Sequence, residues 1–326
     1  MPDKQKPKVG FYWCASCGGC EESIVDLAED ILMVTDSVDI VFWPVALDFK
    51  KDDVKKMEDG SILVTMINGA IRTSEQEEMA RLIRKKSKLI IAYGSCAHLG
   101  GIPSLANEFS RDEIIKYAYK GAPTVINNEG TILLTKFMHG TREITLPVFR
   151  KMVRTLDQVI DVDYYLPGCP PTPKILKNAI LTLLSGELPP KGTVLTSDNA
   201  LCEECPRKDT KPTDLAFKHF IRPHMILSDK DKCLLAQGIL CMGPATRGGC
   251  ETLCINGNMP CSGCFGPTSR VRDQGAKMLS SICSNIDAKT EAEIDAVLEE
   301  IPDPVGTFYR YGLASSLLRK KVMEEI

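Results

Sequence analysis

Short apolar runs alternate with amphipathic stretches through the first half of the chain. Runs that are apolar almost throughout, as expected of strands buried on both faces of a parallel sheet, occupy residues 9–13, 38–43, 61–67, 88–93 and 159–166. Apolar residues at helical spacing predict helices over residues 21–33, 74–86 and 174–184. Strands that alternate with helices indicate an α/β fold, a doubly wound parallel sheet with right-handed crossovers.

Local signals refine this pattern at a few places. Ser74 is placed to cap its helix, and Glu77 three residues later completes a capping box. Residues 111–120 predict a weaker helix, whereas residues 124–142 favour neither helix nor strand.

The hydrophobic periodicity of the chain weakens after a cluster of glycine and proline at residues 185–196. We therefore expect a sheet domain over residues 1–190 and a smaller, irregular domain over residues 191–326. The second part shows little hydrophobic periodicity apart from helices predicted at 290–301 and 308–319. A segment with so little apolar pattern is expected to depend on bound metal for much of its folding free energy.

Composition narrows the class of protein. The 326 residues are 44% hydrophobic and 25% charged, and the formal net charge is −3. This balance argues against a nucleic-acid partner, and the basic cluster at residues 84–86 is best interpreted as a solvated helix face. The polar N-terminus resembles no export signal and no run has membrane-spanning length, so we expect a cytoplasmic protein with no membrane partner. In the cytosol, 14 cysteines indicate metal or redox chemistry rather than disulfides.

Four of these cysteines follow the carboxyl ends of predicted strands. They are Cys17, Cys20, Cys96 and Cys169. Because the carboxyl ends of parallel strands share one edge of a sheet, thiols far apart in sequence are expected to meet there. The topology thus predicts one site with four thiolates.

Eight more cysteines crowd the second part of the chain. They are Cys202, Cys205, Cys233, Cys241, Cys250, Cys254, Cys261 and Cys264. Zinc could use two sets of four, but zinc sites usually pair Cys-x-x-Cys knuckles at a regular spacing, which the single thiols here break. Iron-sulfur clusters, which accept looser spacing, fit better, and a structural zinc-binding module remains the alternative from another class.

Five motifs together resemble the small subunit of [NiFe] hydrogenases. In the family's order they are Cys17-Gly18-Gly19-Cys20-Glu21-Glu22-Ser23, Gly94-Ser95-Cys96-Ala97 with Gly100-Gly101-Ile102, Pro167-Gly168-Cys169-Pro170-Pro171, Cys241-Met242-Gly243-Pro244-Ala245-Thr246 and Pro260-Cys261-Ser262-Gly263-Cys264. The resemblance implies a flavodoxin-like first domain and a catalytic nickel-iron centre on a separate large subunit.

The resemblance also implies three [4Fe-4S] clusters that relay electrons from H2 oxidation. The proximal cluster would bind Cys17, Cys20, Cys96 and Cys169. The distal cluster would bind Cys202, Cys205, Cys233 and Cys241, and the medial cluster would bind Cys250, Cys254, Cys261 and Cys264. No catalytic residue is expected on this chain itself.

Two departures from the membrane-linked members specify the subgroup. Cys202 and Cys205 stand where those members use a histidine and a cysteine, and Cys254 completes a medial set that is often one thiolate short. The chain thereby resembles the cytoplasmic, methyl-viologen-reducing and deazaflavin-non-reducing type of methanogenic archaea. Its implied partners are a small iron-sulfur electron-acceptor subunit and a flavin-bearing heterodisulfide reductase complex. The small subunit of the deazaflavin-reducing relative is an alternative, and a quinone-reductase subunit is disfavoured because the chain has no Cys-Cys pair.

Three further residues receive individual predictions. Cys14, at the end of a strand, is expected to be a small buried hydrophobe, and Cys283 is expected to be structural. Glu22 matches the glutamate that follows the family's first motif, and either partner contact, proton traffic or helix-start stabilisation would account for it.

Overall fold

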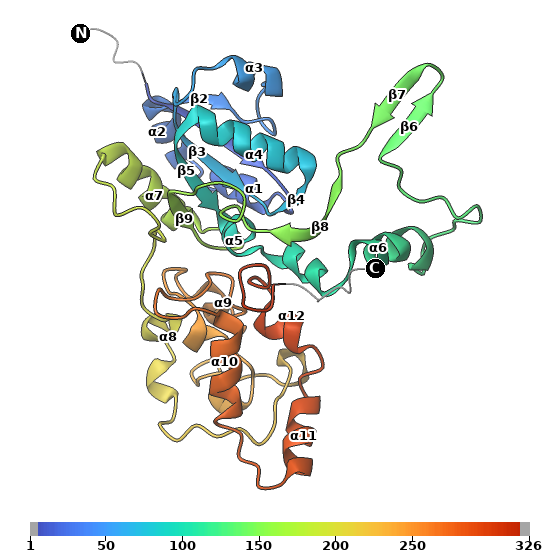
Figure 1. Cartoon of the computed structure of the whole chain (residues 1–326). Coiled ribbons are helices and arrows are strands. Elements are labelled where there is room, and N and C mark those ends of the chain that lie inside the picture. The colour runs from blue at the N-terminus through green and yellow to red at the C-terminus, as the bar shows by residue number, and fades with distance from the viewer. Residues whose placement is uncertain (1–5, 320–326) are drawn as a thin grey trace.

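The structure is a computed structural model that describes residues 6–319. Its centre is a five-stranded sheet in which every neighbouring pair is parallel. In sheet order the strands are β2 (Asp39–Phe42), β1 (Lys8–Trp13), β3 (Ile62–Asn68), β5 (Ser87–Tyr93) and β9 (Tyr164–Leu166). Counting sheet strands along the chain, this order is 2-1-3-4-5, the flavodoxin-like arrangement. The predicted doubly wound fold is confirmed (Figure 1).

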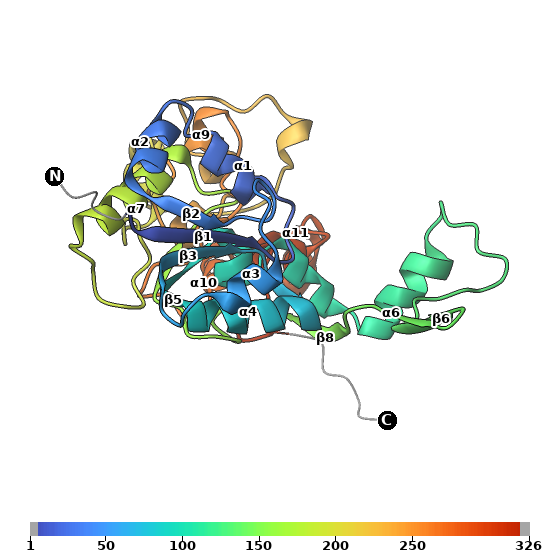
Figure 2. The same cartoon turned by 90° about the horizontal axis from the view of Figure 1, so that it is seen from above.

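Helices cover both faces of the sheet (Figure 2). One face carries α1 (Gly19–Val25), α2 (Asp30–Ser37) and α7 (Pro173–Ser185), and the other carries α3 (Lys51–Lys56) and α4 (Ser74–Lys86), with α5 (Gly94–Leu99) after β5. Each face has its own apolar core. The first includes Phe11, Ile24 and Leu176, and the second includes Ile67 and Ile83. Strands between two such cores must be apolar on both sides, which is why the sequence pattern revealed them.

One predicted helix and one predicted helix cap in the sheet domain need correction. The helix expected over residues 21–33 is broken into α1 and α2, because Ala28 adopts a left-handed backbone conformation with φ of 50°. The cap of α4 is Thr73, whose side chain accepts from the backbone of Gln76, rather than Ser74 with Glu77. Ser74 instead accepts a hydrogen bond from the backbone N–H of Val148 at 2.9 Å.

The strand predicted over residues 159–166 is shorter than expected. Only Tyr164–Leu166 pair with β5, because the residues before them turn and present the carboxylate of Asp163 to the sheet. That carboxylate accepts hydrogen bonds from Arg84 Nη1 at 2.7 Å and from the backbone N–H of Ile90 at 2.8 Å, and Lys191 Nζ lies at 2.5 Å. Asp163 therefore ties the end of α4 and the edge of β5 to the segment before β9.

We expect Asp163→Asn to lower the free energy of unfolding by about 2 kcal/mol at neutral pH, because it leaves Arg84 without its anionic partner. Burial raises the pKa of Asp163, but the bonds from Lys191 and Arg84 outweigh it, and the net pKa is lowered. The stabilisation is then present above the unfolded-state pKa of about 4 and is lost as the pH falls through the lower folded-state value. Thermal melts at several pH values test this: a difference between variant and wild type that does not shrink in acid contradicts it.

Residues 109–148 form a projection, called the arm below, that extends away from the rest of the molecule (Figures 1 and 2). It contains α6 (Arg111–Lys116), a short π-helix (Tyr117–Gly121) and the hairpin of β6 (Lys136–His139) and β7 (Arg142–Thr145). Strand β8 (Phe149–Arg154) returns the chain by pairing antiparallel with β4 (Ile71–Thr73). The α-helix predicted at residues 111–120 thus ends at Lys116, where the short π-helix begins. The segment 124–142, which the sequence left unassigned, contains most of the hairpin.

The second part of the chain consists of loops with short helices. They are α8 (Leu201–Glu204), α9 (Leu253–Asn256), α10 (Gln274–Cys283), α11 (Glu291–Glu299) and α12 (Pro304–Phe308). The predicted helix at 290–301 is confirmed as α11, whereas that at 308–319 is wrong, since α12 ends at Phe308 and turns follow. Helix α10 had no counterpart in the prediction.

This part also has more core than its sequence pattern indicated. Its buried apolar cluster joins loop residues to α10, α11 and α12, with Phe217, Leu234, Met278 and Leu313 among its members. Because these residues come from loops, their burial produces no regular spacing. The contribution of bound metal to folding here, and the division at residue 190, stay predictions. In the part of the chain that the structure describes, we find no helix with the length and apolar character that crossing a membrane requires.

Candidate metal centres

Three cysteines, Cys14, Cys17 and Cys20, lie between the end of β1 and the first turn of α1. Cys17 is exposed, Cys20 is buried on the first turn of α1, and Gly18 between them has φ of 91°, a conformation that favours glycine. Cys14 lies in the core behind α4, as expected of a bystander. The loop therefore offers Cys17 and Cys20, and not Cys14, to a site at the sheet edge.

Cys96 on α5 and Cys169 after β9 approach the same place. Burial raises the pKa of Cys20, and the nearby thiols of Cys96, Cys169 and Cys17 raise it further. Burial, with Cys169 and Cys17, likewise raises the pKa of Cys96 to about 12. The structure thus brings together all four thiols predicted at this edge, and we call them the first set.

Two glycines make room for these thiols. A Cβ atom on Gly94 would lie 2.3 Å from Cys20 Sγ, and one on Gly101 would lie 2.3 Å from Cys96 Sγ. Both glycines have positive φ, of 82° and 61°. Any side chain would displace a thiol of the first set, so these glycines belong to the site although the sequence pattern assigned them no role there.

A second set of thiols gathers around α8. Burial raises the pKa of Cys202 to about 12, and neighbouring Cys241, Cys205 and Cys233 add to the shift. The backbone N–H of Arg207 points at Cys205 Sγ at 3.4 Å, and that of Cys261 points at Cys241 Sγ at 3.4 Å. The buried side chain of Arg207 in turn donates to the backbone oxygen of Ile255 at 3.0 Å.

The third set lies between the other two. Cys264 interacts with Cys250 and Cys254, and also with Cys169 of the first set, whose backbone N–H hydrogen-bonds it. Cys261 interacts with Cys264 and with Cys241 of the second set. A cavity of about 560 Å³ adjoins Cys254 and Cys261, and Arg222 and Arg310 line it. The three sets therefore form one continuous series through the molecule.

Comparisons with known proteins agree over most of the chain. A family model described as "NADH ubiquinone oxidoreductase, 20 Kd subunit" matches residues 17–183. A subunit of the F420-non-reducing hydrogenase of Methanothermobacter thermautotrophicus is 38% identical over 98% of this chain and 99% of its own length. The iron-sulfur subunit of the F420-non-reducing hydrogenase of Archaeoglobus profundus is 36% identical over 97% of this chain and 99% of its own.

The chain belongs to the family of these F420-non-reducing hydrogenase subunits. It is a [NiFe] hydrogenase small subunit, and so part of an oxidoreductase that uses iron-sulfur electron transfer. These relatives match far beyond residue 183, where the family model ends, and the matched region spans most of the second part of the chain.

Solved hydrogenases share the fold of this small subunit. The chain matches one chain of the [NiFeSe] hydrogenase of Desulfomicrobium baculatum at a TM-score of 0.50 and 19% identity, over 81% of this chain and 95% of the other. A chain of the [NiFeSe] hydrogenase of Desulfovibrio vulgaris Hildenborough gives 0.50 and 17%, over 82% and 95%. At this level of identity the likeness concerns architecture alone.

The thiol sets suit the iron-sulfur clusters of a hydrogenase small subunit. Buried thiols crowded against one another have raised pKa values, so they need bound cations to become thiolates. Backbone N–H groups aimed at sulfur, as at Cys205 and Cys241, stabilise the thiolate form. Among residues 6–319, no three Cys, His, Asp or Glu side chains converge closely enough to hold a single metal ion. A cluster of several irons takes its thiolates at wider separation than one ion does.

The structure also reveals a buried carboxylate beside the first set. Glu21 is 5% exposed and accepts hydrogen bonds from Trp43 Nε1 and, at 2.5 Å, from Asn68 Nδ2. Burial raises its pKa, against the effect of these bonds. Glu22, which the motif singled out, is exposed instead. The acidic pair was visible in the sequence, but only the turn of α1 decides which member points inward.

Two residues lie outside the three sets. Cys283 ends α10 and is exposed, so it is not part of a core. His98 on α5 is half-buried and packs against Tyr165, with ring centroids 4.6 Å apart. In the described structure, no interaction links Cys283 or His98 to the three thiol sets.

Proposed function

We propose that this chain is the electron relay of a cytoplasmic hydrogenase and binds three [4Fe-4S] clusters. The first set, Cys17, Cys20, Cys96 and Cys169, would hold the proximal cluster. The third set, Cys250, Cys254, Cys261 and Cys264, would hold the medial cluster, and the second set, Cys202, Cys205, Cys233 and Cys241, the distal one. Bound there, the clusters would carry electrons one at a time.

The observation that carries this proposal is the spatial order of the three sets. Cys264 links the third set to Cys169 of the first, and Cys261 links it to Cys241 of the second. A relay needs its middle member close to both ends, and the third set is close to both. The sequence order of the thiols does not give that arrangement, since the second set precedes the third along the chain.

The partners follow from the ends of the series. The exposed thiol Cys17 would face the large subunit, on which H2 is split at the nickel-iron centre. The second set would face a small iron-sulfur acceptor subunit that leads to a heterodisulfide reductase complex. The names of the relatives, F420-non-reducing, favour this acceptor over the deazaflavin coenzyme. We propose residues 1–190 as the domain of the proximal cluster and residues 191–326 as that of the other two.

Native purification tests the proposal. We expect the chain to be isolated with a nickel-containing large subunit and with about twelve irons and matching sulfide per chain, four for each cluster. A preparation with several zinc ions, no sulfide and no visible absorption would instead support a structural zinc module. About eight irons would leave the hydrogenase assignment intact and remove one cluster.

A further inference from the structure

The arm exposes an unusual amount of apolar surface. Between residues 109 and 148, all of which the structure describes, no side chain is buried. Eleven of the 29 exposed large apolar side chains of the described chain lie within it, including Ile126, Phe137 and Ile144. A two-stranded hairpin is marginally stable in water, and apolar surface gathered in this way marks an interaction site. The arm therefore needs a covering partner.

A buried charge without a partner lies at the base of the arm. Arg72 on β4 is 5% exposed, and its Nε, Nη1 and Nη2 atoms make no hydrogen bond to any described residue. Its guanidinium covers the ring of Phe149 at 4.1 Å. Arginine remains protonated in proteins, and a buried charge is unfavourable unless it is paired. Arg72 therefore has no anion among the described residues, and because its guanidinium nitrogens are closed to solvent, an outside carboxylate reaches them only when the base of the arm opens as a partner binds.

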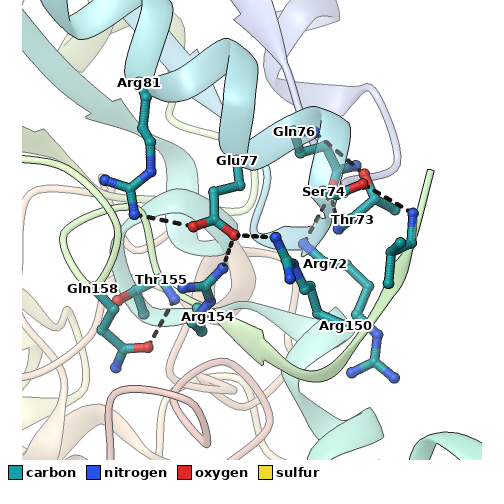
Figure 3. A network of polar contacts seen from close by, with 11 residues as sticks. Arg72, Thr73, Ser74, Gln76, Glu77, Arg81, Arg150, Arg154, Thr155 and Gln158 are labelled. Atoms are coloured by element: carbon teal, nitrogen blue, oxygen red, sulfur yellow. Dashed lines mark hydrogen bonds and ion pairs between the residues drawn. The ribbon is translucent and has the colours of Figure 1, made fainter.

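The surrounding side chains cannot supply that anion. Glu77, the carboxylate of the adjacent network, already pairs with Arg81, Arg150 and Arg154 at 3.0, 3.0 and 2.6 Å. Figure 3 shows the Arg72 guanidinium pointing away from this network, with no contact drawn to it. Arg111 pairs with the neighbouring Asp112 at 3.1 Å, and its like charge acts on Arg72 rather than neutralising it.

The same rim of the molecule carries the first thiol set. Ala15 and Ala70 form an antiparallel bridge with both backbone bonds at 2.9 Å, which joins the loop of Cys17 to the start of β4. Arg72 follows two residues after Ala70, and the exposed Cys17 follows two residues after Ala15. In Figure 2 the arm extends from the end of the sheet toward which β1 runs. Because the bridge is antiparallel, Cys17 and Arg72 lie on opposite sides of it, and a protein that covers Cys17 would also reach the base of the arm under which Arg72 is buried.

We propose that the arm and Arg72 together bind the hydrogenase large subunit, and that a carboxylate of that subunit pairs with Arg72. This rests on the proposed function, because the large subunit is the partner expected over Cys17. Free phosphate would neutralise Arg72 but leave the apolar arm uncovered. A second copy of this chain would occupy the rim through which electrons must enter. One protein partner that presents an acidic side chain within an apolar surface satisfies both features.

Variants of the assembled complex test the pairing. Arg72→Met keeps the packing of the side-chain stem on Phe149 and removes the charge. We expect the large subunit to dissociate at least about 30-fold more readily on dilution, followed by native mass spectrometry, because a buried carboxylate loses its partner. Arg72→Lys should be intermediate. The matched control is Arg81→Met, on the exposed side of the Glu77 network, with dissociation within about twofold of wild type.

A second variant keeps the test decisive if Arg72→Met fails to fold. Phe137 and Ile144 are cross-strand neighbours on the exposed hairpin, so Phe137→Ser with Ile144→Ser cannot disturb the core. We expect this variant also to lose the large subunit while it retains its iron, whereas Leu227→Ser, at a 95% exposed apolar residue of the second part, should retain both.

Three outcomes would overturn the proposal. In the first, both Arg72→Met and the hairpin variant retain the large subunit as well as the wild type does. In the second, the wild-type chain forms a dimer held through the arm. In the third, inorganic phosphate alone raises the melting temperature of the chain as much as the large subunit does. If the wild-type chain carries no nickel-containing large subunit at all, the proposed function fails instead. The two failures are therefore distinguishable.

Discussion

Cys17→Ser is expected to abolish hydrogen-dependent dye reduction by the purified complex and to remove about four of the twelve proposed irons, since the proposed proximal [4Fe-4S] cluster takes four thiolate ligands. Cys17 is the exposed member of the first set, so its replacement disturbs the fold least. The loss should be specific. Direct reduction of the remaining clusters by a chemical reductant, followed by electron paramagnetic resonance without any dye, should persist, because it bypasses the proximal cluster.

The chain contains its own control three residues upstream. Cys14 lies just before the motif in sequence, but its thiol is buried in the core behind α4. Cys14→Ala should therefore retain full iron content and hydrogen-dependent activity, with at most a modest loss of thermal stability from the small cavity. Full iron and activity in Cys17→Ser, or iron loss in Cys14→Ala alone, would show that the first set is wrongly composed.

Gly94→Ala is expected to have an effect nearly as large, although it removes no ligand. The new Cβ would lie 2.3 Å from Cys20 Sγ, well inside van der Waals contact, and the nearby backbone oxygen of Gly168 at 3.5 Å restricts movement in another direction. Cys20 is held by α1 on the opposite side. The thiol must therefore leave its position, and we expect loss of the proximal cluster's iron and of hydrogen-dependent activity.

Backbone strain must be separated from this clash. Gly94 has φ of 82°, so alanine there also incurs about 1 kcal/mol of strain from the left-handed conformation. Gly192 has a similar φ of 87°, but a Cβ on it would meet nothing within 4 Å. Gly192→Ala should show the strain alone, as a slightly lower melting temperature with normal iron. Equal iron content in both variants would contradict the steric account.

The sheet was predictable because its chemistry is local. Strands buried on both faces are apolar throughout, and α4 has a clear stripe, so periodicity alone located β1, β3, β5 and α4 within a residue or two. Where a local backbone choice interrupts the pattern, prediction failed. Ala28 breaks one apolar stripe into α1 and α2, and nothing in the spacing of the stripe signals that break.

The candidate site was predictable to a different extent. That Cys17, Cys20, Cys96 and Cys169 meet follows from strand order, because parallel strands end at one edge. The roles of Gly94 and Gly101 do not follow, since they depend on where individual sulfur atoms lie. The inward turn of Glu21, rather than Glu22, likewise depends on the rotation of α1 against Trp43 and Asn68.

The sequence by itself determined the fold class, the thiols at the sheet edge and, through its motifs, the hydrogenase family. The resemblance implied a middle position for the third thiol set, but only the tertiary structure showed the contacts that join it to the other two, left Arg72 buried without a partner and extended the arm beyond the sheet. The physical reason is the separation along the chain of the residues that interact. Periodicity and motifs record what each segment must do with its immediate neighbours, whereas the contact of Cys264 with Cys169 depends on how two distant parts of the chain pack. The unpaired charge of Arg72 depends on which side chains fail to reach it.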